Sequence, residues 1–149
     1  YELCNRDISP KSPFHVNVGN TFYTKEENSL CVGKEKTFAI LDMIFDELVD
    51  LFPSSYIHIG GDECYKGFWA KCPDCRARMS SKQLQNVEEL QSYFVKRVAS
   101  HIQSKGKHVI GWDEILEGGL AKDAIVMSWR GMKGGVEAAR QGHRVIMTP

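Results

Sequence analysis

Two adjacent carboxylates, Asp62 and Glu63, follow a short apolar run and two glycines in the octet Tyr-Ile-His-Ile-Gly-Gly-Asp-Glu of residues 56–63. Neighbouring acids repel each other, so their placement at the end of a strand favours a chemical task. In closed α/β barrels, active-site residues gather at the C-terminal ends of the strands. One carboxylate of such a pair can stay ionised while the other holds a proton and acts as an acid. The octet therefore predicts an acid-dependent catalytic site, and the alternative is a solvated acidic turn that caps a helix.

Further motifs follow in the same chain. The octet resembles the His-x-Gly-Gly-Asp-Glu signature of the family-20 glycoside hydrolases, the β-N-acetylhexosaminidases, and three later segments resemble the strands that follow in that family. These segments are Val109-Ile110-Gly111-Trp112-Asp113-Glu114, Val126-Met127-Ser128-Trp129-Arg130-Gly131 and Arg144-Val145-Ile146-Met147-Thr148-Pro149. The resemblance implies an α/β fold, a partial (β/α)8 TIM barrel of about four parallel strands with flanking helices.

The resemblance also implies roles for individual residues in a retaining, substrate-assisted reaction, in which the 2-acetamido oxygen of the sugar attacks the anomeric carbon. Asp62 would orient and charge-stabilise the acetamido N–H, and Glu63 would protonate the leaving oxygen and later activate water. Trp112 and Trp129 would enclose the acetamido methyl group, and Glu114 would contribute to sugar binding or to the shape of the pocket. The alternatives are core packing for the two tryptophans and a structural carboxylate for Glu114.

Four further residues of these motifs, two with charged or titratable side chains and two glycines, have other expected tasks. His58 either orients a carboxylate or is a buried histidine of the barrel interior. Arg130 is expected to pair with one of the neighbouring acids. Gly60 and Gly61 permit unusual dihedral angles and a close approach of backbone or ligand at the strand exit.

The chain is shorter than a complete barrel of this kind. A complete eight-stranded barrel has about 250 residues, whereas this chain has 149. We therefore expect residues 1–149 to be a middle segment of one catalytic barrel domain, roughly strands four to seven, with no second domain. The first-strand Arg, the acetamido-binding Tyr and the last-strand Trp of the family lack counterparts. The isolated chain is expected to be inactive and to self-associate through its open sheet edges.

The amino-acid composition limits the classes of binding partner to be expected for this chain. The 19 basic and 19 acidic residues balance and form no long block of either sign, which argues against nucleic acid and anionic membrane surfaces as partners. The apolar runs are too short for a membrane-spanning helix. The resemblance implies a glycan substrate with terminal β-linked N-acetylglucosamine or N-acetylgalactosamine, an extracytoplasmic location (secreted, periplasmic or lysosomal), and no cofactor.

Five cysteines allow several thiol arrangements. Cys72 and Cys75 have the spacing of one zinc-binding pair, with Cys64 as a candidate third ligand, but a structural zinc site usually uses two such pairs. Free thiols or a local disulfide are the preferred interpretation, and no metal is expected. Cys4 with Cys31 is a further candidate bridge.

The elements that must position these residues follow from hydrophobic periodicity. Residues 35–51 and 86–104 carry apolar stripes with the period of a helix, and Asn86 is a suitable cap for the second. Short apolar strands are expected at residues 56–59, 108–112, 124–129 and 143–147. The strands are expected to be connected by one helical turn at 65–70, a polar loop at 71–81, a Gly-rich loop at 117–119 and a short helix near 133–141. Residues 1–34 are expected to form an irregular loop. Alternating helices and strands predict a parallel sheet.

The sequence thus predicts a segment of an exo-β-N-acetylhexosaminidase. Two alternatives remain open at this point. The first is a carbohydrate-binding domain that keeps the fold without the chemistry, and the second is a zinc-stabilised structural domain built round Cys64, Cys72 and Cys75.

Overall fold

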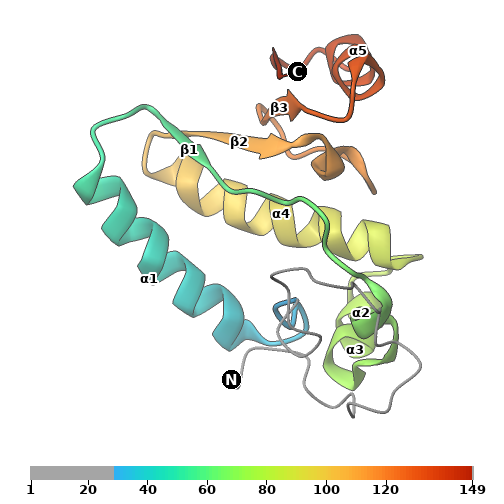
Figure 1. Cartoon of the computed structure of the whole chain (residues 1–149). Helices are drawn as coiled ribbons and strands as arrows, with labels where there is room; N and C mark the ends of the chain where they lie inside the picture. The colour runs from blue at the N-terminus through green and yellow to red at the C-terminus, as the bar shows by residue number, and fades with distance from the viewer. Residues whose placement is uncertain (1–28, 149) are drawn as a thin grey trace, which may run out of the picture.

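Four short parallel strands form the frame of the fold in the computed structural model, which describes residues 29–148. The strands are β1 (Tyr56–His58), β2 (His108–Trp112), β3 (Ile125–Ser128) and β4 (Val145–Met147), and they lie in the sheet in chain order (Figure 1). The registers align Ile57 with Val109, Gly111 with Val126, and Met127 with Ile146. The predicted sheet of about four parallel strands is confirmed, and sequential parallel strands are typical of a (β/α) barrel.

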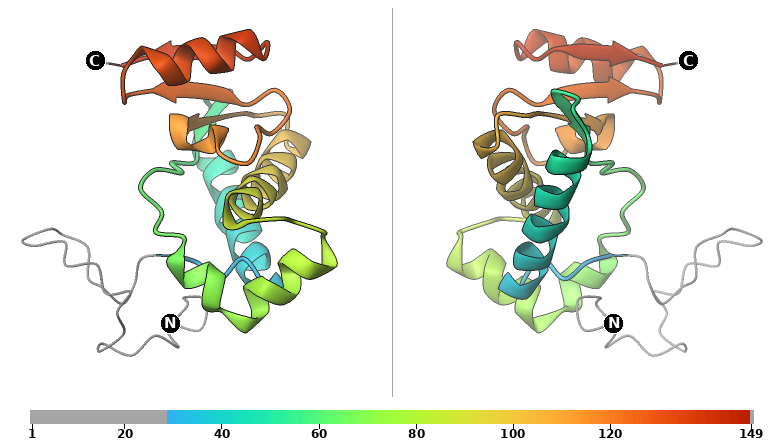
Figure 2. Two further views of the ribbon diagram at one scale, coloured as in Figure 1. Left: turned by 90° about the vertical axis from the view of Figure 1, so that its right-hand side faces the viewer. Right: turned by 90° about the vertical axis from the view of Figure 1, so that its left-hand side faces the viewer.

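Three helices cover one face of this sheet: α1 (Glu35–Leu51), α4 (Val87–Ser104) and α5 (Met132–Arg140). Helices α1 and α4 lie side by side beneath β1 and β2 (Figures 1 and 2). Helix α4 begins at Asn86, whose side-chain oxygen accepts a hydrogen bond of 2.8 Å from the Glu89 N–H, as a helix cap does. Helix α1 ends shortly before Pro53, which has no N–H with which to continue a helix. Both long helices confirm the sequence prediction.

The segment after β1 differs from its prediction. Residues 71–81 were expected to form a polar loop, but most of them belong to a second short helix. Helix α2 (Gly67–Lys71) is followed by α3 (Pro73–Ser81), and a 3-10 turn, η1 (Asp113–Leu116), follows β2. Pro73 suits the first turn of α3, where an N–H would have no partner inside the helix. Cys75 is the only fully buried residue of α3, so this helix lacks the apolar stripe that reveals a helix in the sequence.

Most of the core lies between the helices and the outer face of the sheet. Its buried residues come from α4, the strands, η1 and α5: Val95, Val98, Ala99, Ile102, Val109, Ile115, Ala121, Ala124, Val126 and Ala138. On the opposite, inner face, Arg144 just before β4 donates to the Tyr56 hydroxyl of β1 at 3.3 Å, so side chains from the two edges of the sheet meet. A second cluster joins residues 29–34 to α1, α2, α3 and α4 through Cys31, Val32, Phe38, Trp69, Cys75 and Leu90.

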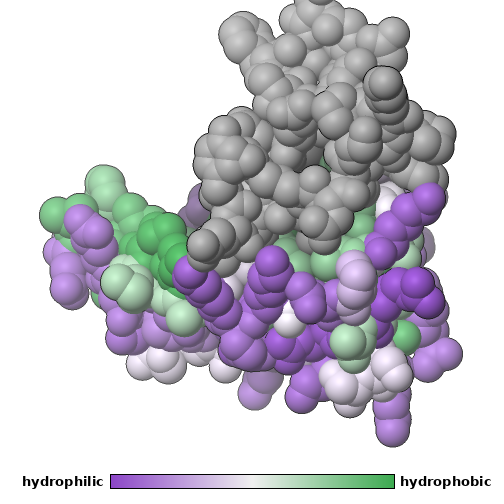
Figure 3. All heavy atoms as spheres, turned by 90° about the horizontal axis from the view of Figure 1, so that it is seen from below, coloured by the Kyte–Doolittle hydropathy of each residue, from purple (hydrophilic) through white to green (hydrophobic). Residues whose placement is uncertain are grey.

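Among the described residues, an apolar patch is exposed on α1 and just beyond it. Met43, Ile44, Leu51 and Phe52 are exposed, and apolar side chains gather at this end of the molecule in Figure 3. Within residues 29–148, no helix is long and apolar enough to cross a membrane. The irregular loop predicted for residues 1–34 lies outside the described residues, apart from positions 29–34.

Candidate active site

The chain leaves β1 through a tight turn that brings both carboxylates to the C-terminal rim of the sheet. The ladder first continues past His58, since the Trp112 N–H donates to the Gly60 carbonyl at 2.9 Å. Gly60 and Gly61 then adopt φ values of 72° and 96°, and Glu63 has a φ of 46°. A left-handed backbone is uncommon for a residue other than glycine, and such strain occurs often at functional sites. Asp62 and Glu63 are both exposed beyond this turn.

Close packing fixes the backbone just before the carboxylates. Ile115, which is 1% exposed, lies between Gly61 and Gly111. A Cβ atom on either glycine would come within 2.8 Å of the Ile115 Cγ2 atom, a distance at which something must shift. Both glycines are therefore needed for contact, and Gly61 is needed for its dihedral freedom as well.

Three rings from neighbouring strands meet at the same rim. The indoles of Trp112 and Trp129 lie with their centroids 6.4 Å apart and their planes at 69°, and the His58 ring lies 4.8 Å from that of Trp112. Neither tryptophan belongs to the core clusters, and Trp129 is 39% exposed. The structure thus brings the two predicted tryptophans together on the inner face, away from the helices.

His58 connects these rings with the carboxylates. Its Nδ1 atom accepts a hydrogen bond of 3.0 Å from the Gly60 N–H. Partial burial lowers the pKa of His58, and the negative charge of Asp62 opposes that shift. The ring is exposed among residues 29–148, and both interpretations of His58, an orienting group or a buried histidine of a complete barrel, stay predictions.

The second acid pair, Asp113 and Glu114, is buried, and both side chains have polar partners. Asp113 is 2% exposed and Glu114 is 6% exposed. The Trp129 Nε1–H donates to Glu114 Oε2 at 3.1 Å, while Arg130 Nε donates to Asp113 Oδ1 at 2.8 Å and lies 3.4 Å from Glu114 Oε1. Burial raises the pKa of Glu114, and the Trp129 hydrogen bond opposes that shift. The predicted pairing of Arg130 with these acids is confirmed, and Glu114 holds the Trp129 indole in place.

Asp62 and Glu63 make fewer contacts than the buried pair Asp113 and Glu114. Within residues 29–148, neither makes a hydrogen bond or an ion pair. Asp62 borders an apolar cavity of about 260 Å³, which also touches Phe45 of α1 and Phe94 of α4. A pocket of about 620 Å³ lies at the opposite, N-terminal end of the strands, lined by residues such as Lys107, His143 and Arg144. None of the predicted site residues lines that pocket, so the C-terminal rim is the candidate active site.

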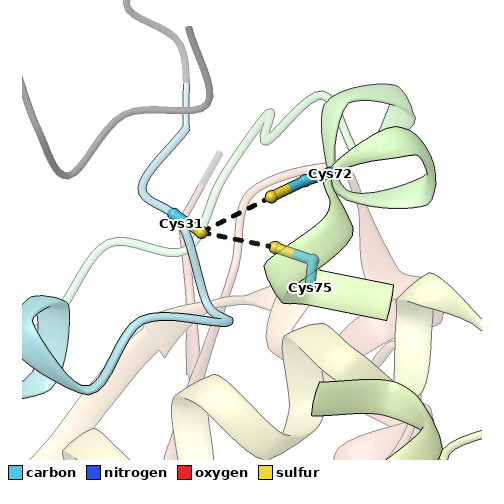
Figure 4. A group of neighbouring side chains, drawn as sticks. All are labelled: Cys31, Cys72 and Cys75. Atoms are coloured by element: carbon cyan, nitrogen blue, oxygen red, sulfur yellow. Dashed lines mark hydrogen bonds between the residues drawn. The ribbon is translucent and has the colours of Figure 1, made fainter. Parts of the chain in front are cut away.

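Three thiols form a group that the sequence did not indicate. Figure 4 shows Cys31 facing Cys72 and Cys75, with Sγ–Sγ distances of 3.6 Å and 3.7 Å. The third member is Cys31, and the proposed third partner Cys64 lies outside the trio. All four described cysteines are free. The candidate bridge from Cys4 to Cys31 lies outside the described residues.

Known proteins resemble this chain in sequence. The family described as glycosyl hydrolase family 20, catalytic domain, matches residues 7–149. A β-hexosaminidase of Porphyromonas gingivalis is 52% identical over 124 residues, which are 83% of this chain and 16% of that protein.

Solved structures resemble it in fold as well. A β-N-acetylhexosaminidase of Bacteroides fragilis matches with a TM-score of 0.74 and 35% identity over 83% of this chain and 26% of that one. An exo-β-N-acetylglucosaminidase of Vibrio harveyi in complex with N-acetylglucosamine matches with a TM-score of 0.77 and 30% identity over 85% of this chain and 20% of that one. The chain therefore spans between 16% and 26% of the length of these three proteins.

Proposed function

Because the chain belongs to glycosyl hydrolase family 20, we propose that it supplies roughly strands four to seven of the catalytic barrel of an exo-β-N-acetylhexosaminidase. The observation that carries this proposal is the position of Asp62 and Glu63. They emerge at the C-terminal end of β1, beside a rim on which Trp112 and Trp129 meet. A carboxylate pair beside apolar walls at the ends of parallel strands suits an N-acetylated sugar, and active sites of such barrels occupy this rim.

The proposed reaction is substrate-assisted hydrolysis with retention. Glu63, in its protonated form, donates its proton to the glycosidic oxygen as the bond from that oxygen to the anomeric carbon breaks. The carbonyl oxygen of the sugar's 2-acetamido group forms a new bond to the anomeric carbon and gives a cyclic oxazolinium intermediate. Asp62 accepts a hydrogen bond from the acetamido N–H and stabilises the positive charge that develops. Glu63 then takes a proton from water, and that water opens the ring to release the hemiacetal.

The remaining rim residues position the sugar. Trp112 and Trp129 form apolar walls for the acetamido methyl group and press its oxygen toward the anomeric carbon, because correct orientation supplies much of the acceleration of such reactions. Glu114 shapes the pocket by accepting the hydrogen bond from Trp129. Arg130 contacts both Asp113 and Glu114 and so compensates the charge of a buried acid pair.

This pocket is incomplete in residues 1–149 under the proposal. An Arg that binds the outer hydroxyls, a Tyr that binds the acetamido oxygen and a last-strand Trp have no counterpart in the segment. The isolated chain should therefore be inactive, and a polypeptide with the complete barrel should be active. The substrate would be a glycan with terminal β-linked N-acetylglucosamine or N-acetylgalactosamine, in an extracytoplasmic location.

Hydrolysis of chromogenic hexosaminides tests the proposal. A protein with the complete barrel should release nitrophenol from the β-N-acetylglucosaminide or the β-N-acetylgalactosaminide and spare the matching β-glucoside, which lacks the acetamido nucleophile. The separate chain should show negligible turnover. Binding of N-acetylglucosamine by the complete barrel without hydrolysis would instead identify a carbohydrate-binding domain, and equal cleavage of the β-glucoside would contradict the substrate-assisted route.

A further inference from the structure

The thiol trio lies where two parts of the chain meet, away from the carboxylates. Cys31 belongs to the segment that leads into α1, whereas Cys72 and Cys75 flank the start of α3. Cys31 and Cys75 are 1% and 0% exposed, and Cys72 is half-buried. The three sulfur atoms lie within 4.8 Å of one another, so they can share one ion.

The spacing of the sulfurs suits a shared metal ion. In a tetrahedral site with Zn–S bonds of about 2.3 Å, neighbouring sulfurs are about 3.8 Å apart. Cys31 Sγ lies 3.6 Å from Cys72 Sγ and 3.7 Å from Cys75 Sγ. A disulfide would need one S–S distance of about 2.05 Å and would leave the third thiol without a partner. The two near-equal distances from Cys31 fit two edges of such a tetrahedron, and the distance between the Cys72 and Cys75 sulfurs is within 4.8 Å.

The backbone around Cys31 is arranged to hold negative charge on sulfur. The N–H groups of Gly33 and Lys34 donate to the Cys31 sulfur. Thiolate, not thiol, is the form that binds a metal, and backbone N–H groups directed at a sulfur favour that form.

Close contacts fasten the two parts of the trio to each other. A Cβ atom on Gly33 would come within 2.1 Å of the Asp74 backbone carbon, so this position has room only for glycine. The Trp69 Nε1–H donates to the Leu30 carbonyl at 2.9 Å, and Arg78 donates to the Gly33 carbonyl at 3.1 Å. These contacts preorganise the sulfurs, which is what a structural metal site requires.

We propose that Cys31, Cys72 and Cys75 bind a zinc ion through three thiolates, and that this ion fastens the α2–α3 segment to the start of α1. Soft thiolate ligands favour zinc among the common divalent ions. The fourth position of the tetrahedron is filled by a ligand from outside the trio. Binding releases the thiol protons to solvent. The proposed zinc site is independent of the proposed glycosidase activity, because its three cysteines lie outside the carboxylate pair Asp62 and Glu63.

Metal analysis of the reduced, desalted chain, purified after growth with zinc, tests the proposal. The chain should carry about one zinc ion. Cys72→Ser and Cys75→Ser should each weaken zinc binding by more than the ~10–100-fold that is typical of losing only a supporting contact. Cys64→Ser is the matched control, because Cys64 is a neighbouring thiol outside the trio and should keep its zinc.

Replacement of zinc by cobalt(II) keeps the test decisive if a variant does not fold. The wild-type chain should then show thiolate-to-cobalt charge-transfer absorption, which a chelator abolishes. A fully reduced wild-type chain that binds neither metal would overturn the proposal. A disulfide between Cys31 and either partner in zinc-free protein, or loss of zinc in Cys64→Ser equal to that in Cys72→Ser, would overturn it as well.

Discussion

Replacing Gly61 with alanine should damage both the fold and the candidate active site, for two separable reasons. The residue has a φ of 96°, and a left-handed backbone costs about 1–2 kcal/mol for an L-residue with a Cβ atom. That Cβ atom would also lie 2.8 Å from Ile115 Cγ2 in the tightly packed core, and overpacking of this kind costs about 1–3 kcal/mol. Gly61→Ala should therefore lower the free energy of unfolding by about 2–5 kcal/mol, since the two effects add.

Gly106→Ala separates the two effects. Gly106 has a φ of 76°, and a Cβ atom there would meet nothing within 4 Å, so this variant carries the backbone cost alone, about 1–2 kcal/mol. Both variants lose the flexibility of glycine in the unfolded state, and that contribution cancels in the comparison. Urea denaturation of the two variants should thus differ by the steric term, about 1–3 kcal/mol.

The same pair of variants connects packing with catalysis. Asp62 follows Gly61 directly, and a displacement of about 1 Å at a reacting group can cost about 10²-fold in rate. In a protein with the complete barrel, Gly61→Ala should lower kcat/KM by about that factor, and Gly106→Ala should leave it unchanged. Equal stability and equal kcat/KM for the two variants would refute the claim that Ile115 fixes the strand exit.

Three further outcomes are expected. Burial raises the pKa of Glu114, so its ionisation costs folding free energy as the pH rises above 4.5; urea denaturation at several pH values should show Glu114→Gln gaining stability relative to wild type from acid to neutral pH. Trp129→Phe keeps an apolar ring but removes the hydrogen bond to Glu114, and it should lower kcat/KM by about tenfold, the equivalent of one net hydrogen bond. Within residues 29–148, β1 and β4 are edge strands of the sheet and Met43 and Phe52 are exposed, so the isolated chain should self-associate; light scattering that shows a monomer at all concentrations would contradict this.

Local sequence signals predicted the elements that carry an apolar stripe or a cap. The stripe of residues 35–51 gave α1 its observed bounds, and Asn86 marked the start of α4. The strands were recognisable because each is a short apolar run between turn residues. Helix α3 was missed because it buries only one residue, so its sequence shows no apolar residues repeated at the period of a helix.

Contacts between distant residues could not be read from spacing. The Trp129 indole donates to Glu114 because the ends of β2 and β3 are neighbours in the sheet, and the motifs alone did not reveal that contact. Cys31 joins Cys72 and Cys75 from 41 and 44 positions away. The spacing within the sequence favoured Cys64 instead, because proximity along the chain is a poor guide to proximity across two packed segments.

The most direct test of the proposed chemistry compares two leaving groups in a protein with the complete barrel. Glu63→Gln removes the acid, so it should lower hydrolysis of a disaccharide far more than hydrolysis of a nitrophenyl glycoside, whose leaving group needs little protonation. Asp62→Asn weakens the acetamido nucleophile and should impair both substrates to a similar degree. Equal losses on both substrates for Glu63→Gln would contradict its assignment as the acid, and with it the account of this site.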